Sequence, residues 1–190
     1  MSTEKEQIRQ LFKDKRKALS PEEAQRRSEL IFRQFQVWFN SHPEIAHIHI
    51  YLPIAHQNEI NTLLIRDYLL GRGNSVYTSI VKSGTLQLDT VKIDSNTIFE
   101  INKWGIPIPQ NISAISPNKI QLVLIPLLAF DIKGNRIGFG KGYYDVFLSG
   151  LDGEVLKVGL SFFDPVPQIP SETHDIPLDY CITSEKVFTF

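Results

Sequence analysis

The chain has 190 residues, with 20 basic and 21 acidic side chains and a formal net charge of -1. This length allows a real hydrophobic core, and we expect residues 1–190 to form a single domain. The balanced charge gives no reason to expect nucleic acid or an anionic membrane as a partner. A single cysteine, Cys181, excludes a disulfide within one chain, and no apolar run is long enough to span a bilayer. We therefore expect a cytoplasmic protein, and we take it to be a monomer.

Two amphipathic helices are predicted to precede the first strand. The first spans Thr3–Lys17, and its Lys5 and Arg9 lie on one face because they are spaced i, i+4. The second spans Ser20–Asn40, where the serine caps the helix and Pro21 suits the first helical position. Without further information, the basic residues of the first helix read as a solvated stripe.

The rest of the chain alternates between strand and helix patterns. Apolar or alternating runs predict strands at Ala46–Leu52, Ser75–Val81, Thr85–Val91, Gln121–Ile125, Leu156–Ser161 and Tyr180–Thr183, and helices at Glu59–Leu70 and Gly142–Leu148. This order indicates an α/β protein, with three α/β/α layers and a mostly parallel, Rossmann-like central sheet. Ligands bind at the carboxyl edge of such sheets, so the loop after Ile125 is a candidate site.

That loop is rich in glycine. Asp131–Asp145 reads D-I-K-G-N-R-I-G-F-G-K-G-Y-Y-D, and its alternating glycines allow backbone N–H groups to converge on an anion. It is not a dinucleotide fingerprint, because Tyr143 stands where the third glycine is needed. It is not a Walker loop either, because Gly142 replaces the Ser or Thr that should follow Lys141.

Charged residues in the loop suit a phosphate ligand. Arg136 offers a planar fork and Lys141 a point charge, and the helix that follows presents its positive N-terminal end. Asp145 lies one turn after the lysine and could hold a magnesium ion. The composition therefore favours phosphate binding, with a flexible basic loop as the alternative.

The order of strand, proline, apolar pair, Asp, Gly-x-Arg and G-x-G-x-G-Tyr-Tyr-Asp closely resembles the 5-formyltetrahydrofolate cyclo-ligase family, also called methenyltetrahydrofolate synthetases. The resemblance covers nearly the whole chain. It implies ATP-dependent closure of 5-formyltetrahydrofolate, a small-molecule substrate, to 5,10-methenyltetrahydrofolate with the help of Mg²⁺. The implied ATP-binding residues are Lys5, Arg9, Arg136, Ile137, Gly138, Phe139, Gly140, Lys141, Gly142, Tyr143 and Tyr144, of which Arg136, Lys141, Tyr143 and Tyr144 would be catalytic.

The resemblance also implies a folate site and a metal site. The implied folate-binding residues are Ile54, Glu59, Trp104, Phe139, Gly140, Lys141, Gly142 and Tyr143, and the implied magnesium ligands are Asp145 and Asp175. A carboxylate such as that of Glu59 can accept paired hydrogen bonds from a pterin. Judged by the residues alone, Glu59 is equally an acidic residue of a helix first turn, Trp104 a core residue, and Asp175 part of a turn.

Three other functions compete with this interpretation. His47-x-His49 on a strand could belong to a zinc hydrolase, because both imidazoles would face the same side. A phosphosugar or acyl-CoA enzyme could use the same basic and acidic residues, since a fold does not fix a function. A protein that binds folate or nucleotide without turnover is the third, because Phe139 and Ile108 depart from the family pattern.

Overall fold

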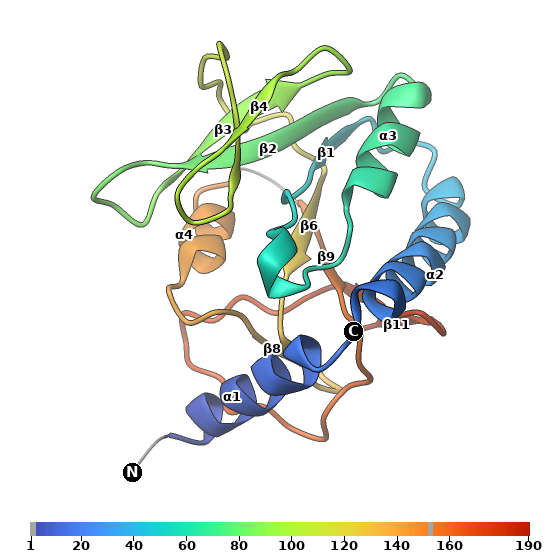
Figure 1. Cartoon of the computed structure of the whole chain (residues 1–190), viewed down its shortest axis with the longest axis vertical. Coiled ribbons are helices and arrows are strands. Elements are labelled where there is room, and N and C mark those ends of the chain that lie inside the picture. Colours follow the sequence, from blue (N-terminus) through green and yellow to red (C-terminus); the bar gives the residue numbers. More distant parts are fainter. Residues whose placement is uncertain (1–2, 152–153) are drawn as a thin grey trace.

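A central sheet organises the computed structural model, which describes residues 3–151 and 154–190 (Figure 1). The sheet has seven strands in the order β11-β10-β9-β6-β1-β2-β3. The pairs β10–β9, β9–β6, β6–β1 and β1–β2 are parallel, whereas the edge strands β3 and β11 pair antiparallel. The sheet strands are β1 (His47–His49), β2 (Ser75–Val81), β3 (Leu88–Ile93), β6 (Leu122–Pro126), β9 (Leu156–Leu160), β10 (Tyr180–Ile182) and β11 (Val187–Thr189). The predicted α/β fold with a mostly parallel sheet is confirmed.

Helices cover both faces of this sheet. The helices are α1 (Glu4–Lys17), α2 (Pro21–Asn40), α3 (Leu63–Gly71) and α4 (Tyr143–Ser149), with a 3₁₀ turn η1 at Ala55–Gln57. Strand β6 shows why both faces need cover, because successive side chains of a strand point in opposite directions. Leu122 and Leu124 pack into the core that contains Phe35 of α2, whereas Val123 and Ile125 pack into the core of α4.

Helix α1 lies apart from these layers. Its buried Phe12 packs against Leu128, Ala129 and Ile137, so the helix rests on a small hairpin rather than on the sheet. That hairpin, β7 (Ala129–Phe130) with β8 (Arg136–Ile137), is the first half of the glycine-rich segment (Figure 1). A second hairpin, β4 (Phe99–Ile101) with β5 (Pro107–Pro109), carries the Trp104 segment. Neither hairpin was predicted from the sequence.

The start of helix α3 differs from the prediction. The predicted helix Glu59–Leu70 begins only at Leu63, and Glu59 lies in the irregular segment between η1 and α3. Asn58, in a left-handed conformation with φ of 47°, ends η1, and Thr62 caps α3, so Glu59 lies outside both helices. The interpretation of Glu59 as a residue of a helix first turn is therefore wrong.

Candidate active site

A buried carboxylate fixes the geometry of the β7–β8 hairpin. Asp131 Oδ1 accepts hydrogen bonds from the backbone N–H groups of Lys133 and Asn135, both at 2.9 Å. Its Oδ2 accepts from the Asn135 side chain and from the Ile169 N–H, also at 2.9 Å. These bonds satisfy a fully buried charge. They also hold the strand that presents Arg136 to the site.

The glycine-rich loop meets helix α1 through Arg9. The Arg9 Nε donates to the Gly138 carbonyl at 3.1 Å. Gly140 has φ of 97°, and a Cβ built there would lie 3.1 Å from the Arg9 guanidinium carbon. Glycine is thus required by both the backbone conformation and the close approach of the arginine. Arg9, Gly138 and Gly140, predicted from distant parts of the chain, lie together, whereas Lys141 is exposed at the same loop.

The two predicted magnesium ligands lie close to each other, and each contacts a cation. Asp145 Oδ1 accepts from Arg136 Nη2 at 2.8 Å and from the Ile176 N–H at 3.1 Å. Asp175 Oδ2 accepts from Lys5 Nζ at 2.6 Å. Burial by itself raises the pKa of Asp175, but the hydrogen bonds from Lys5 and from the Glu172 N–H, together with the nearby positive charge, outweigh burial and lower the pKa. The basic and acidic residues of the prediction therefore share one cluster.

The donor set of this cluster fits magnesium. Asp145 uses Oδ1 for its hydrogen bonds and Asp175 uses Oδ2, so each carboxylate keeps a second oxygen for a metal. Magnesium is commonly held by one or two carboxylates, with waters and substrate phosphates as its other ligands. Within residues 3–151 and 154–190, no group of three or more His, Cys, Asp or Glu side chains could hold a metal ion. Two carboxylates are therefore what this region offers.

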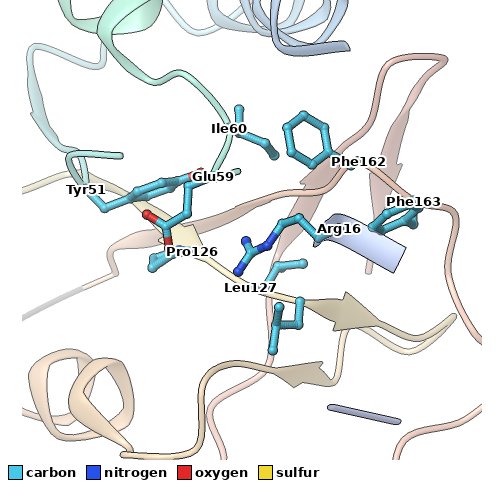
Figure 2. A pocket seen from close by; sticks show the side chains of 9 residues that line it. Arg16, Tyr51, Glu59, Ile60, Pro126, Leu127, Phe162 and Phe163 are labelled. Carbon is cyan, nitrogen blue, oxygen red and sulfur yellow. The ribbon is translucent and has the colours of Figure 1, made fainter. Parts of the chain in front are cut away.

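A small cavity lies between α1 and the carboxyl end of the sheet (Figure 2). Glu59 lines it, and its Oε2 accepts a hydrogen bond from the Ile54 N–H at 2.8 Å. Burial raises the pKa of the Glu59 carboxyl, although this backbone hydrogen bond and nearby Arg16 oppose the shift. The cavity has a volume of about 10 Å³. The predicted folate residues Ile54 and Glu59 are thus brought together.

Tyr144 connects this cavity to the loop. Burial raises the pKa of Tyr144 far above its usual value, and the negative charge of Glu59 adds to the shift, while Arg136 opposes it. Its ring lies edge-on to those of His49 and Phe147, which fixes its position. The hydroxyl therefore stays protonated at any physiological pH. Tyr143, at the start of the same helix, is half-buried.

Trp104 is 62% exposed at the turn between β4 and β5, so its interpretation as a core residue is wrong. The Lys103 ammonium lies 4.4 Å from the centre of its ring. The adjacent Gly105 touches η1, because a Cβ built there would lie 2.5 Å from the His56 side chain. The tryptophan therefore stands beside the segment that carries Ile54, free to stack on a planar ligand.

The histidines of the zinc interpretation have other partners. The His47 ring lies 2.8 Å from the Tyr77 hydroxyl, and His49 Nε2 lies 2.6 Å from the Ser79 hydroxyl. His49 is fully buried, and burial lowers its pKa to about 3, so its ring is neutral. Nothing in the described part of the chain completes a ligand set around them. The geometry gives no support to a zinc hydrolase.

Arg16 is a residue that the sequence did not assign to a site. It continues the basic face of Lys5 and Arg9 along the first helix, yet it is only 7% exposed. Its spacing of four from the apolar Phe12 was the available signal, since that spacing places both on one helix face. The guanidinium lies between the Phe139 ring, 4.9 Å away, and the cavity of Glu59. Phe139, assigned to both ligands, therefore covers Arg16.

Comparison with known proteins identifies the family. A family model, "5-formyltetrahydrofolate cyclo-ligase family", matches residues 1–184. The chain belongs to that family. The Mycoplasma genitalium 5-formyltetrahydrofolate cyclo-ligase is 30% identical over 181 residues, which cover 94% of this chain and 97% of the relative. The mouse 5-formyltetrahydrofolate cyclo-ligase is 28% identical, with 94% and 93% covered.

Solved structures agree with the family assignment. The NMR structure of the Aquifex aeolicus 5,10-methenyltetrahydrofolate synthetase has a TM-score of 0.81 and 27% identity, and covers 98% of this chain and 93% of its own. The Mycoplasma pneumoniae 5,10-methenyltetrahydrofolate synthetase has a TM-score of 0.75 and 26% identity, with 96% and 100% covered. The chain is thus an enzyme of the cyclo-ligase kind that acts on a folate. In its described residues, no helix is both long and apolar enough to cross a membrane.

Proposed function

We propose that the enzyme uses ATP and Mg²⁺ to convert 5-formyltetrahydrofolate into 5,10-methenyltetrahydrofolate, ADP and phosphate. The observation that carries this proposal is the position of Tyr144. It adjoins Asp145 in the first turn of α4, and the charges of both Glu59 and Arg136 act on its hydroxyl, so a folate ring bound by Glu59 and a terminal phosphate bound by Arg136 would meet near it.

The triphosphate would bind where α1 meets the glycine-rich loop. Lys5 and Arg9 from the helix, Arg136 and Lys141 from the loop, and the loop amides of 137–143 supply the positive charge. Arg136 and Lys5 form ion pairs with Asp145 and Asp175. Binding of Mg-ATP would exchange these partners, with the cations turning to phosphate oxygens. Magnesium held by the two carboxylates would neutralise charge on the transferring phosphoryl group.

The folate would lie on the opposite side of Tyr144. Glu59 would accept hydrogen bonds from the pterin, Ile54 and Trp104 would contact its ring system, and Tyr143 would border the reacting end. Phe139 would bound this site through its contact with Arg16.

The reaction needs positioning rather than a protein nucleophile. The formyl carbon is a poor electrophile because N5 donates electron density into its carbonyl group. Transfer of the γ-phosphoryl group to the formyl oxygen gives ADP and an iminium-like formyl phosphate. N10 then attacks the activated carbon, its proton is lost, and the C–O bond breaks to release phosphate. Tyr144 and Arg136 would stabilise the oxygen during transfer, since a neutral phenol and a guanidinium both donate hydrogen bonds.

A turnover assay tests the proposal. Purified protein is mixed with 5-formyltetrahydrofolate and Mg-ATP, and the near-ultraviolet band of the methenyl product is followed while ADP is measured in parallel. Product that forms only with ATP and matches ADP one for one supports the proposal. A folded sample that retains folate without forming ADP would instead favour a binding protein, and ADP formed without methenyl product would favour another phosphoryl acceptor.

A further inference from the structure

Arg16 is a buried cation whose charged end faces the folate cavity. It belongs to the last turn of α1, and its side chain reaches past Leu127 toward Glu59 and Tyr51 (Figure 2). Only 7% of the residue is exposed. Burial lowers the pKa of Arg16, although nearby Glu59 opposes the shift, so this group is held where its charge is poorly solvated.

The guanidinium of Arg16 has no hydrogen-bond or ion-pair partner in residues 3–151 and 154–190, although the Arg16 carbonyl accepts a bond from the Asn58 side chain at 3.2 Å. Its flat face is covered by the Phe139 ring at 4.9 Å. An aromatic ring on the face leaves the N–H groups at the edge free to point elsewhere. Because burying an unpartnered charge is unfavourable, a side chain held this way is suited to an acceptor that arrives with a ligand.

The chemistry of a pterin supplies such an acceptor. A carboxylate that pairs with the pterin 2-amino group and N3–H lies directly beside the C4 carbonyl of the same ring edge. Both oxygens of Glu59 can take part in this pairing, because Oε2 accepts one hydrogen bond from the Ile54 N–H and keeps a second lone pair. Arg16 lines the same cavity as Glu59, so its guanidinium is within reach of the side of the ring where the C4 carbonyl oxygen would lie.

We propose that Arg16 is a substrate-binding residue that donates hydrogen bonds to the C4 carbonyl oxygen of the pterin and selects 4-oxo over 4-amino pteridines. The proposal rests on the proposed function, because it assumes that Glu59 pairs with a pterin. Glu59 accepts hydrogen bonds from two donors of the ring, and a 4-amino pteridine also presents donors to it. Glu59 by itself therefore does not distinguish the two rings. Arg16 recognises the acceptor of the ring, which is the C4 carbonyl oxygen. An amino group at C4 would leave the N–H donors of Arg16 unpaired.

The cavity must open for this contact to form. Its volume of about 10 Å³ has room for roughly one water molecule, far less than a pterin ring. Glu59 belongs to the loop between β1 and α3, whose Ala55 and His56 are exposed, whereas Arg16 belongs to α1. Outward movement of that loop, with Glu59 carried along, would widen the cavity between Glu59 and Arg16 and admit the ring.

The test compares two ligands that differ at one atom. Binding of folic acid and of 4-aminofolic acid is measured by titration calorimetry for the wild type and for Arg16→Met, with folding checked by circular dichroism. The wild type should prefer the 4-oxo compound. In Arg16→Met, affinity for the 4-oxo compound should fall about 10–100-fold, as expected for loss of charge-assisted hydrogen bonds, while the 4-amino compound changes little. An equal loss for both ligands, or an unchanged ratio, would overturn the proposal.

Arg27→Met is the matched control. Arg27 also borders this region, but its Nη1 donates to the Phe162 carbonyl at 3.1 Å and its guanidinium faces Phe163. Its loss should leave the ligand ratio unchanged. If Arg16→Met does not fold, Arg16→Lys retains the charge but not the fork, and the ratio should then fall about tenfold.

Turnover separates this inference from the proposed function. If the wild type converts 5-formyltetrahydrofolate but Arg16→Met keeps the wild-type ratio of affinities, the proposed role of Arg16 is rejected and the proposed function stands. Wild-type protein that binds neither ligand nor turns over the formyl folate would reject both.

Discussion

Single side chains in this site face competing demands in the ligand-free and loaded states. Arg136 and Lys5 each hold an acidic partner, whereas Lys141 in the same loop is exposed. These ion pairs neutralise the acidic side chains, and under the proposed function the cations would exchange partners when phosphate binds. Lys141 is the cation whose role in the fold is smallest, so its substitution separates catalysis from stability.

Replacement of Lys141 by alanine should lower kcat about 100-fold, because a removed donor to transition-state charge typically costs this much. The melting temperature should change by less than about 1 °C, since surface substitutions away from packed features have small effects. Turnover and thermal melts measure the two quantities. Lys133→Ala, an exposed lysine on the far side of the hairpin turn, is the control. Wild-type rates in a folded Lys141→Ala protein would remove the loop lysine from the mechanism.

Replacement of Glu59 by glutamine should weaken folate binding about 10–100-fold, because one partner of a charge-assisted pair is lost. The same change should stabilise the ligand-free protein at neutral pH. Burial raises the pKa of Glu59, so the folded state holds this proton more tightly than the unfolded state. The stability contributed by the proton is present below the ordinary Glu pKa and is lost as the pH rises through the raised value.

Urea unfolding of wild type and Glu59→Gln at several pH values measures this difference. Above the raised pKa the variant should be the more stable protein, and the gap should close in acid. Folate binding by the wild type should weaken as the pH falls through the same range, because the protonated carboxyl accepts hydrogen bonds poorly. A gap that is constant with pH would show that Glu59 does not titrate in this range.

At the scale of elements, several side chains hold helix α1 to the rest of the protein. Phe12 packs into the hairpin core, Arg9 donates to the Gly138 carbonyl, and Lys5 donates to Asp175. Arg9 and Lys5 are also proposed ligand contacts. The helix that would bind ATP is therefore fixed partly by the groups that ATP would engage.

Replacement of Lys5 by methionine should loosen the first turns of α1, so that backbone amides there exchange hydrogen about 3–10-fold faster, consistent with an ion pair worth about 1 kcal/mol. Hydrogen exchange read by mass spectrometry measures it, and Lys17→Met, at the exposed end of the helix, should leave these amides unchanged. The wild-type protection should itself be lost in acid. The lowered pKa of Asp175 means that its contribution is present above the ordinary Asp pKa and disappears as the pH falls through the lowered one.

At the scale of the whole molecule, the hairpin below the site is packed against the C-terminal part of the chain. Leu178 donates its N–H to the Gly134 carbonyl at 2.9 Å. A Cβ built on Gly134 would lie 2.8 Å from the Leu178 carbonyl oxygen and 2.8 Å from the Phe190 ring. The turn that presents Arg136 therefore depends on residues far away in the sequence.

Gly134→Ala should destabilise the protein more than Gly84→Ala does. Both glycines have positive φ, of 81° and 77°, so both alanines carry about 1–2 kcal/mol of backbone strain. Gly84 has nothing within 4 Å of a built Cβ, whereas Gly134 meets backbone, which adds about 1–3 kcal/mol for the displaced neighbours. Denaturant unfolding of the two variants gives the difference. Equal destabilisation of the two variants would mean that Leu178 and Phe190 shift to accommodate the added methyl group with no cost in free energy.

The sequence alone determined most of the sheet strands, the start of α2 and the chemistry of the loop. Apolar and alternating runs depend only on neighbouring residues, so every sheet strand except β11 was predicted within a few residues, and Ser20 and Pro21 mark the N-terminal end of α2. The order of residues in 131–145 likewise carried the family resemblance. These features depend on residues that are neighbours along the chain, so they can be recognised from the sequence alone.

Tertiary structure decided what distant residues do together. Helix geometry put Arg16 on the basic face of α1, but only packing of Phe12 on the hairpin buried that arginine beside Glu59. The segment before α3 that holds Glu59 was predicted to be helical, because the sequence pattern cannot show that this carboxylate accepts a hydrogen bond from the Ile54 N–H. The contacts of Lys5 with Asp175 span 170 residues. Such contacts arise from chain folding over long separations, and no periodicity in the sequence encodes them.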